Sequence, residues 1–163
     1  MRFLSLACLA ALNAVLIFGA EKYTGPIPPK TDIPYLLHAD QLVETEAGEA
    51  KEETKKDSVV AILPGASSPA RTPLAEPIFI IKTQKLSAER ISAFKLDVKN
   101  GTREVVINSQ GRRKSRDLTK PIFVNVTRLG DNLYKIEVDQ MLENGEYTLS
   151  PEGSNQTFSF EIY

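Results

Sequence analysis

The chain has 163 residues, of which 42% are apolar and 25% are charged, with 20 basic and 21 acidic side chains, one Cys, one His and no Trp. This length allows one domain of ordinary size, and the composition excludes both a wholly disordered chain and a membrane protein with several spans. The near-neutral charge argues against a nucleic-acid partner, because nucleic acids are bound by a concentrated basic surface.

Residues 1–20 have the layout of a secretory signal peptide. A basic start at Arg2 is followed by the apolar run Phe3–Phe18 and then by small residues, which is the order of regions in such a signal. We expect cleavage after Ala20 and export to the periplasm or the outside of a bacterial cell. The bacterial setting follows because cleavage removes the only Cys, Cys8, whereas small exported animal domains usually rely on disulfides. An uncleaved N-terminal membrane anchor is the alternative.

Residues 21–75 are predicted to form an acidic, Pro-rich tether. They hold seven of the ten prolines, and each Pro fixes its own backbone angle and disfavours a helix in the residue before it. Within this region, residues 35–57 contain good helix formers with Glu before Lys at helical spacing, which favours a short helix. The apolar segment Leu36–Val43 is either a docking peptide for a partner or a segment that packs on its own C-terminal domain or stays loose. Val59–Leu63 predicts an edge strand added to that domain.

Residues 76–163 show short apolar strands at regular spacing, separated by turn signals such as Asn100-Gly101. This pattern predicts an all-β domain, namely a single small antiparallel Greek-key sandwich of about seven strands. A small antiparallel barrel is the alternative. The predicted strands are centred on residues 78–82, 93–98, 103–108, 121–127, 133–138, 147–149 and 158–162.

A local motif in this domain resembles the tyrosine corner of immunoglobulin-like and fibronectin-like domains. In the segment 143–149, an acidic residue and Gly145 precede Tyr147. In that family the Tyr hydroxyl bonds to the backbone upstream, and the resemblance implies this role for Tyr147, with Gly145 at the small position. The chain lacks the Cys pair and the core Trp of antibody domains, so the resemblance concerns architecture. The whole layout also resembles that of uncharacterised exported bacterial proteins, which implies no specific activity.

The residue inventory leaves little material for catalysis. The only His, His38, lies in the predicted tether, where it is not held as the base of a triad must be. We predict no metal and no cofactor, because a protein zinc site uses three or four ligands and no glycine-rich phosphate loop opens a helix. A carboxylate hydrolase is the remaining enzymatic alternative, and it needs acidic side chains to converge in a cleft. The candidates are Asp97, Glu104, Asp131, Glu137, Asp139 and Glu143.

Four basic residues follow Gly111 in a predicted loop: Arg112, Arg113, Lys114 and Arg116. Such a cluster can bind an anionic envelope surface or an acidic protein face, and a solvated loop that aids solubility is the alternative. From these features we predict an exported, non-catalytic module that acts through its surface on an envelope protein or an anionic envelope surface. An N-terminally anchored accessory subunit of an envelope complex is the alternative.

Overall fold

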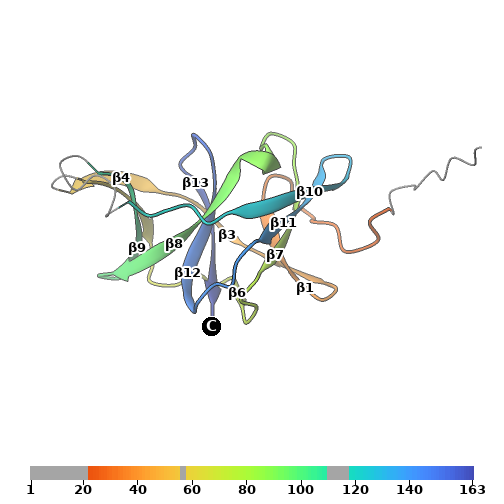
Figure 1. Ribbon diagram of the computed structural model, residues 1–163, viewed down its shortest axis with the longest axis horizontal. Coiled ribbons are helices and arrows are strands. Elements are labelled where there is room, and N and C mark those ends of the chain that lie inside the picture. Colours follow the sequence, from red (N-terminus) through yellow and green to blue (C-terminus); the bar gives the residue numbers. More distant parts are fainter. Residues whose placement is uncertain (1–21, 56–57, 110–117) are drawn as a thin grey trace, which may run out of the picture.

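The computed structural model describes residues 22–55, 58–109 and 118–163, and the regular elements of this part of the chain are all β-strands apart from one short 3-10 helix (Figure 1). The predicted signal segment, residues 1–20, lies outside these ranges. The elements are β1 (Pro34–His38), β2 (Gln41–Glu44), β3 (Glu46–Glu49), β4 (Lys51–Lys55), β5 (Ser58–Pro64), β6 (Arg71–Thr72), β7 (Ile78–Lys82), the 3-10 helix η1 (Ala88–Arg90), β8 (Ile91–Lys99), β9 (Thr102–Ser109), β10 (Val124–Gly130), β11 (Leu133–Val138), β12 (Gly145–Pro151) and β13 (Gln156–Ile162).

The strands form two sheets. One has five strands in the order β10-β11-β7-β1-β2, and the other has eight, in the order β3-β13-β12-β8-β9-β5-β4 with β6 beside β13. Neighbouring strands pair antiparallel, except that the short β6 runs parallel to β13. The prediction of an all-β fold with antiparallel sheets is confirmed, and a strand lies at each of the seven places predicted after residue 76.

The larger core lies between the two sheets. Apolar side chains from β1, β7 and β11 of the five-stranded sheet meet those of β8, β12 and β13 of the eight-stranded sheet. At its centre, the rings of Phe79 and Phe160 are 5.0 Å apart in an edge-to-face arrangement, and Tyr147 stacks on Phe160 at 5.6 Å. Both contacts follow geometries that aromatic pairs prefer, and the first joins the two sheets directly.

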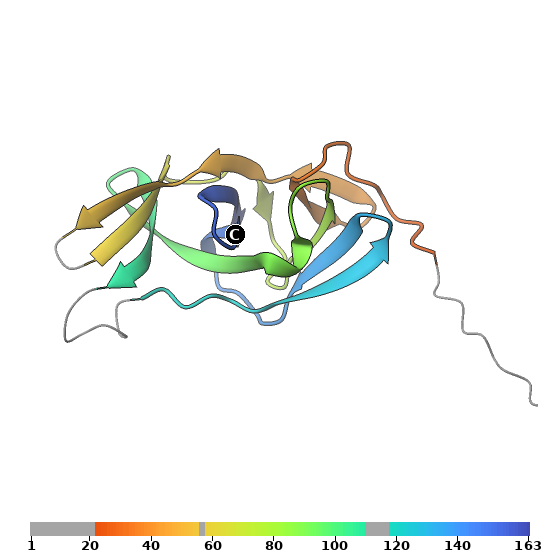
Figure 2. The ribbon, with the colours of Figure 1, turned by 90° about the horizontal axis from the view of Figure 1, so that it is seen from above.

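The eight-stranded sheet is rolled, because one segment of chain pairs with strands at both of its ends. The segment 46–55 pairs with β13 through β3 and with β5 through β4. Between these halves, the N–H of Ala50 donates to the carbonyl of Asn155 at 2.9 Å. Figure 2 shows this segment on one side of the molecule and the segment 118–123, which leads into β10, on the opposite side.

A second, smaller core fills the inside of this rolled sheet. It consists of Ala50, Ala61, Leu63, Leu96 and Val105, with Phe94 packed against it. Side chains alternate between the faces of a strand, so β8, β12 and β13 turn one set of residues toward the larger core and the other set toward the inside of the roll. This arrangement explains why β12 and β13 are buried along nearly their whole length.

The predicted tether is wrong, because residues 34–72 contribute six strands to the two sheets. The predicted helix over 35–57 is also wrong: this stretch forms the β1–β2 hairpin and the strands β3 and β4. Hydrogen-bonded pairing with β5 overrides the helix propensity of the charged β4, since local propensity is a weak preference that tertiary contacts routinely override. Leu36 is buried in the larger core, as the prediction of packing on the C-terminal domain requires.

Two local predictions concern a strand and a turn. Val59–Leu63 lies within the strand β5, as predicted, but its predicted place at an edge is wrong, because β5 has β4 on one side and β9 on the other. Asn100 and Gly101, with φ of 52° and 81°, form the two-residue turn between β8 and β9, in which Lys99 pairs with Thr102. Positive φ at both positions is what such a hairpin turn requires, and Asn-Gly meets that requirement.

Candidate functional site

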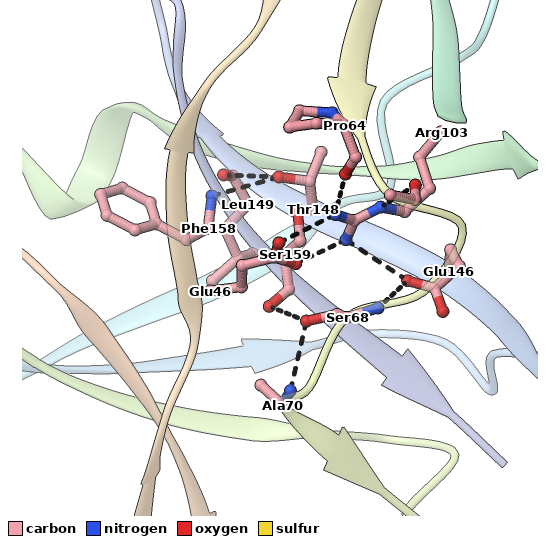
Figure 3. A network of polar contacts seen from close by, with 11 residues as sticks. Glu46, Pro64, Ser68, Ala70, Arg103, Glu146, Thr148, Leu149, Phe158 and Ser159 are labelled. Carbon is pink, nitrogen blue, oxygen red and sulfur yellow. Dashed lines mark hydrogen bonds and ion pairs between the residues drawn. The ribbon is translucent and has the colours of Figure 1, made fainter. Parts of the chain in front are cut away.

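The most deeply placed charge of the described chain is Arg103 on β9, which is only 1% exposed. Figure 3 shows its guanidinium facing the carboxylates of Glu46 and Glu146. Two of its nitrogens donate to the two carboxylate oxygens of Glu46, at 2.6 and 2.9 Å. Its other hydrogen bonds go to the carbonyls of Pro64 at 2.7 Å and Gly65 at 3.1 Å. The guanidinium thus joins β9 to β3 and to the end of β5.

Glu146 on β12 is the second buried charge of this network. Its carboxylate lies 3.6 Å from the Arg103 guanidinium and accepts a hydrogen bond from the backbone N–H of Ser68 at 3.0 Å. Burial raises the pKa of Glu146 above its ordinary value, although the Ser68 N–H and the charge of Arg103 oppose that shift. The Arg103 guanidinium donates its hydrogen bonds to acceptors of its own chain. We therefore assign the network a structural role, which is to hold the rolled sheet closed.

The sequence prediction did not include Arg103, although the pattern of β9 carries a signal for it. Arg103 has the same parity as Val105 and Ile107, so the alternation of a strand places all three on one face. A buried charged residue on an otherwise apolar face needs an oppositely charged partner. The partner, Glu46, lies in the segment that was predicted to be a tether, so local alternation alone does not identify it.

Tyr147 is buried, and its hydroxyl donates to the backbone carbonyl of Glu143 at 2.8 Å. This is a bond to the backbone upstream, the type of contact that the tyrosine-corner resemblance implies. Gly145 has φ of 151°, a value that side-chain-bearing residues rarely adopt. Burial raises the pKa of the Tyr147 hydroxyl, so it remains a hydrogen-bond donor over the physiological pH range.

The carboxylates predicted for a hydrolase are distributed over β8, β9, β11 and the turns that flank β11 and precede β12. Five of them form ion pairs with separate cations: Asp97 with Lys99, Glu104 with Lys55, Asp131 with Arg128, Glu137 with Lys135 and Glu143 with Lys95. Asp97 and Glu104 face each other across the β8–β9 pair. Within the described ranges, no three His, Cys, Asp or Glu residues come together as a metal site would require.

Two further predictions concern His38 and the basic cluster. His38 ends β1 and faces Gln41 across the hairpin, so its assignment to a tether is wrong. The basic cluster of Arg112, Arg113, Lys114 and Arg116 lies outside the described residues. In the part of the chain that the structure describes, no helix has the length and apolar character needed to cross a membrane.

The candidate interaction site is the edge strand β10. It ends the five-stranded sheet and pairs with β11 on one side. Just before β10, Ile122 bridges to Ala93 of β8, and beyond that bridge the other side of β10 presents backbone groups that a further strand can bind. The first part of β10 carries the exposed, uncharged Asn125 and Thr127, whereas edge strands that resist further pairing commonly carry charges or Pro. The opposite edge, β2, is only four residues long, and Glu44 there binds Lys30 and Tyr35.

Two strongly exposed apolar side chains lie near the start of β10. Phe123 is 80% exposed and Met141 is 77% exposed. Their segments are neighbours, because the N–H of Asp139 donates to the carbonyl of Phe123 at 3.3 Å. A hollow at this place is lined by Lys95, Ile122, Gln140, Met141, Leu142, Glu143 and Tyr147. Neighbouring exposed apolar groups are a common mark of a protein interaction site.

Comparisons with protein-family models, with curated proteins and with solved structures find no match for this chain.

Proposed function

We propose that the chain is an exported, non-catalytic β-sandwich module that acts in the bacterial cell envelope by binding another protein. The observation that carries this proposal is the open edge of β10 with Phe123 and Met141 beside it. A partner segment in extended conformation would pair with β10 through backbone hydrogen bonds, while its apolar side chains contact Phe123 and Met141. Strand addition of this kind supplies affinity through the main chain and specificity through the side chains.

The assignment to the envelope depends on the signal-like layout of residues 1–20. An immunoglobulin-like architecture is part of the proposal, and the hydrogen bond from the Tyr147 hydroxyl to the Glu143 carbonyl supports it. An N-terminally anchored accessory subunit is the alternative form of the same function. N-terminal sequencing of the mature protein separates the two, because a protein that starts at Glu21 has no anchor.

Site-specific crosslinking in cells tests the binding proposal. A photoreactive amino acid is introduced at Asn125 or Thr127 on β10 and, as the control, at Glu152, whose side chain is 69% exposed. We expect a discrete adduct from both β10 positions after cell fractionation into envelope and cytoplasm. The adduct should be lost when Phe123→Ser and Met141→Ser are combined, since both side chains are exposed and their replacement leaves the fold intact.

Three results bear against the proposal. Adducts that form equally well from Glu152 would show that β10 has no special role. Adducts that survive the double substitution would remove Phe123 and Met141 from the site. An adduct with the mass of two copies of this chain would show that β10 binds a second copy of the chain and not an envelope protein.

A further inference from the structure

A second site lies inside the rolled eight-stranded sheet, away from β10. Beside the crossing at Ala50, a hollow of about 80 Å³ opens to solvent between β4 and the turn that joins β12 to β13. We refer to it as the roll hollow. Its walls are mostly apolar and are formed by side chains that include Leu63, Phe94, Val105 and Ile107.

The polar residues of the roll hollow have a definite arrangement along the strands. Thr148 and Ser150 belong to β12, Ser154 and Asn155 to the adjoining turn, Thr157 to β13 and Glu52 to β4. Ser150 donates to the carbonyl of Gln156, and the carbonyl of Asn155 accepts from Ala50, so these groups are engaged in holding the turn. Glu52 is exposed and is the one charged residue among the described residues that line the hollow.

Apolar walls with one carboxylate define the chemistry of a ligand. An apolar cavity of roughly 150 Å³ takes up benzene, so the roll hollow, with about half that volume, suits an alkyl end group of about three carbons, such as the isopropyl end of a longer chain whose remaining atoms lie at the opening to solvent. A positive charge on the ligand is favoured at the carboxylate and a negative charge is disfavoured. We propose that the roll hollow binds a small alkylammonium group, with its alkyl end against Phe94 and Ile107 and its ammonium near Glu52.

This proposal is independent of the proposed function, because none of the residues that line the roll hollow belongs to β10. An alkylammonium group has two sources, a free amine and the side chain of a peptide lysine. The chemistry is the same for both, and the experiment therefore includes a probe for each.

NMR titration of the isotopically labelled protein tests the assignment, with amide signals as the readout. The probes share a branched alkyl group and differ in charge: isopentylamine is positive, 3-methylbutanol is neutral and isovalerate is negative. We expect isopentylamine to bind with a Kd of about 1–10 mM, in keeping with the small number of atoms involved. The alcohol should bind more weakly and isovalerate least, with shifts centred on the amides of Ala61 and Val105.

Matched variants identify the two parts of the site. Glu52→Gln should weaken amine binding about three- to fivefold, which is the size expected for an exposed ion pair, and leave the alcohol unchanged. Glu53→Gln serves as the control, because alternation along β4 turns Glu53 to the other face. Ile107→Ser should weaken both amine and alcohol, whereas Val98→Ser, on an exposed position of β8 outside the hollow, should weaken neither.

The outcomes separate clearly. Equal binding of isopentylamine and isovalerate, equal effects of Glu52→Gln and Glu53→Gln, or shifts located away from β5 and β9 would each overturn the proposal. The amide of Nα-acetyl-lysine distinguishes the sources: binding as tight as that of isopentylamine assigns the site to a peptide lysine, and weaker binding assigns it to a free amine. If neither probe binds at 50 mM (a concentration about fivefold above the upper end of the expected Kd range), the roll hollow is not an alkylammonium site.

Discussion

Arg103 and Glu46 form a two-pronged ion pair, with nitrogen to oxygen distances of 2.6 and 2.9 Å, that joins β9 to β3. The two residues are 57 positions apart in the chain. A planar guanidinium that meets both oxygens of one carboxylate gives the strongest and most directional form of this interaction. The pair therefore fixes the place where the eight-stranded sheet closes, and its loss has consequences that can be measured.

Replacing Arg103 by Met should destabilise the protein by about 3–5 kcal/mol, because the substitution leaves Glu146 buried without its cation and Pro64 without its donor. Urea denaturation gives the free energy of unfolding. Arg128→Met is the control: its ion pair with Asp131 is exposed and should contribute no more than about 1 kcal/mol. Similar losses of unfolding free energy in the two variants would contradict the role of the buried Arg103 in holding the rolled sheet closed.

Tyr147→Phe should cost about 1–2 kcal/mol of stability, since it removes the donor to the Glu143 carbonyl while the ring stays packed on Phe160. The same measurement on Tyr163→Phe, at an exposed position, should show almost no change. If Tyr147→Phe proved as stable as the parent protein, the hydrogen bond at this corner would have no net effect on folding.

Phe160→Ala should cost about 3–5 kcal/mol, because the ring lies between Phe79 and Tyr147 in the core shared by the two sheets. Phe123→Ala provides a matched comparison, in which the same atoms are removed from an exposed side chain. We expect the latter to change the free energy of unfolding by less than about 0.5 kcal/mol. A small loss for Phe160→Ala would mean that the two sheets do not share this core in solution.

The contribution of Asp32 to stability should depend on pH. Burial opposes its ionisation, but the backbone N–H groups of Gln84, Leu86 and Lys85 outweigh that effect and hold the pKa of the Asp32 carboxyl below its ordinary value. A lowered folded-state pKa stabilises the fold above the unfolded-state pKa, and that stabilisation is lost as pH falls through the folded-state pKa.

Asp32→Asn should therefore destabilise the protein by about 1 kcal/mol at pH 7, a value reduced for solvent screening at this partly exposed site. The difference should shrink steadily as the pH is lowered from 5 toward 3. Asp97→Asn, in the exposed pair with Lys99, should show a much smaller dependence. A difference between Asp32→Asn and the parent protein that stays constant over this range would show that the charge of Asp32 is not involved.

The fragment 76–163 should not unfold cooperatively by itself, whereas 22–163 should give a single transition. The fragment lacks β1, which lies between β7 and β2, and β5, which lies between β9 and β4. Without β1 and β5, both cores are open on one side, so too little apolar surface is buried to offset the conformational entropy that the chain loses on folding. Circular dichroism during thermal unfolding distinguishes the two cases. A cooperative transition in the fragment 76–163 would mean that these residues form a domain of their own, as the sequence predicts.

The C-terminal strands could be predicted because their signals are local. Leu133–Val138 alternates apolar and polar residues, and Asn100-Gly101 provides the backbone angles that its turn needs. The β4 segment could not be predicted in this way: its side chains are all exposed, and no apolar face marks it as a strand. It is extended because β5 supplies its hydrogen-bond partners, a contact that the sequence of β4 does not encode.

By itself, the sequence determined the class of the fold, since alternation with a period of two and Gly- or Asn-containing turns permit antiparallel strands and little else after residue 76. Tertiary structure decided that residues 34–72, in the acidic, Pro-containing part of the chain, belong to the same two sheets. It also decided that Arg103 faces Glu46 and that β10 is left as an open edge. These features depend on which distant strands become neighbours, and strand neighbours are chosen by the packing of whole sheets.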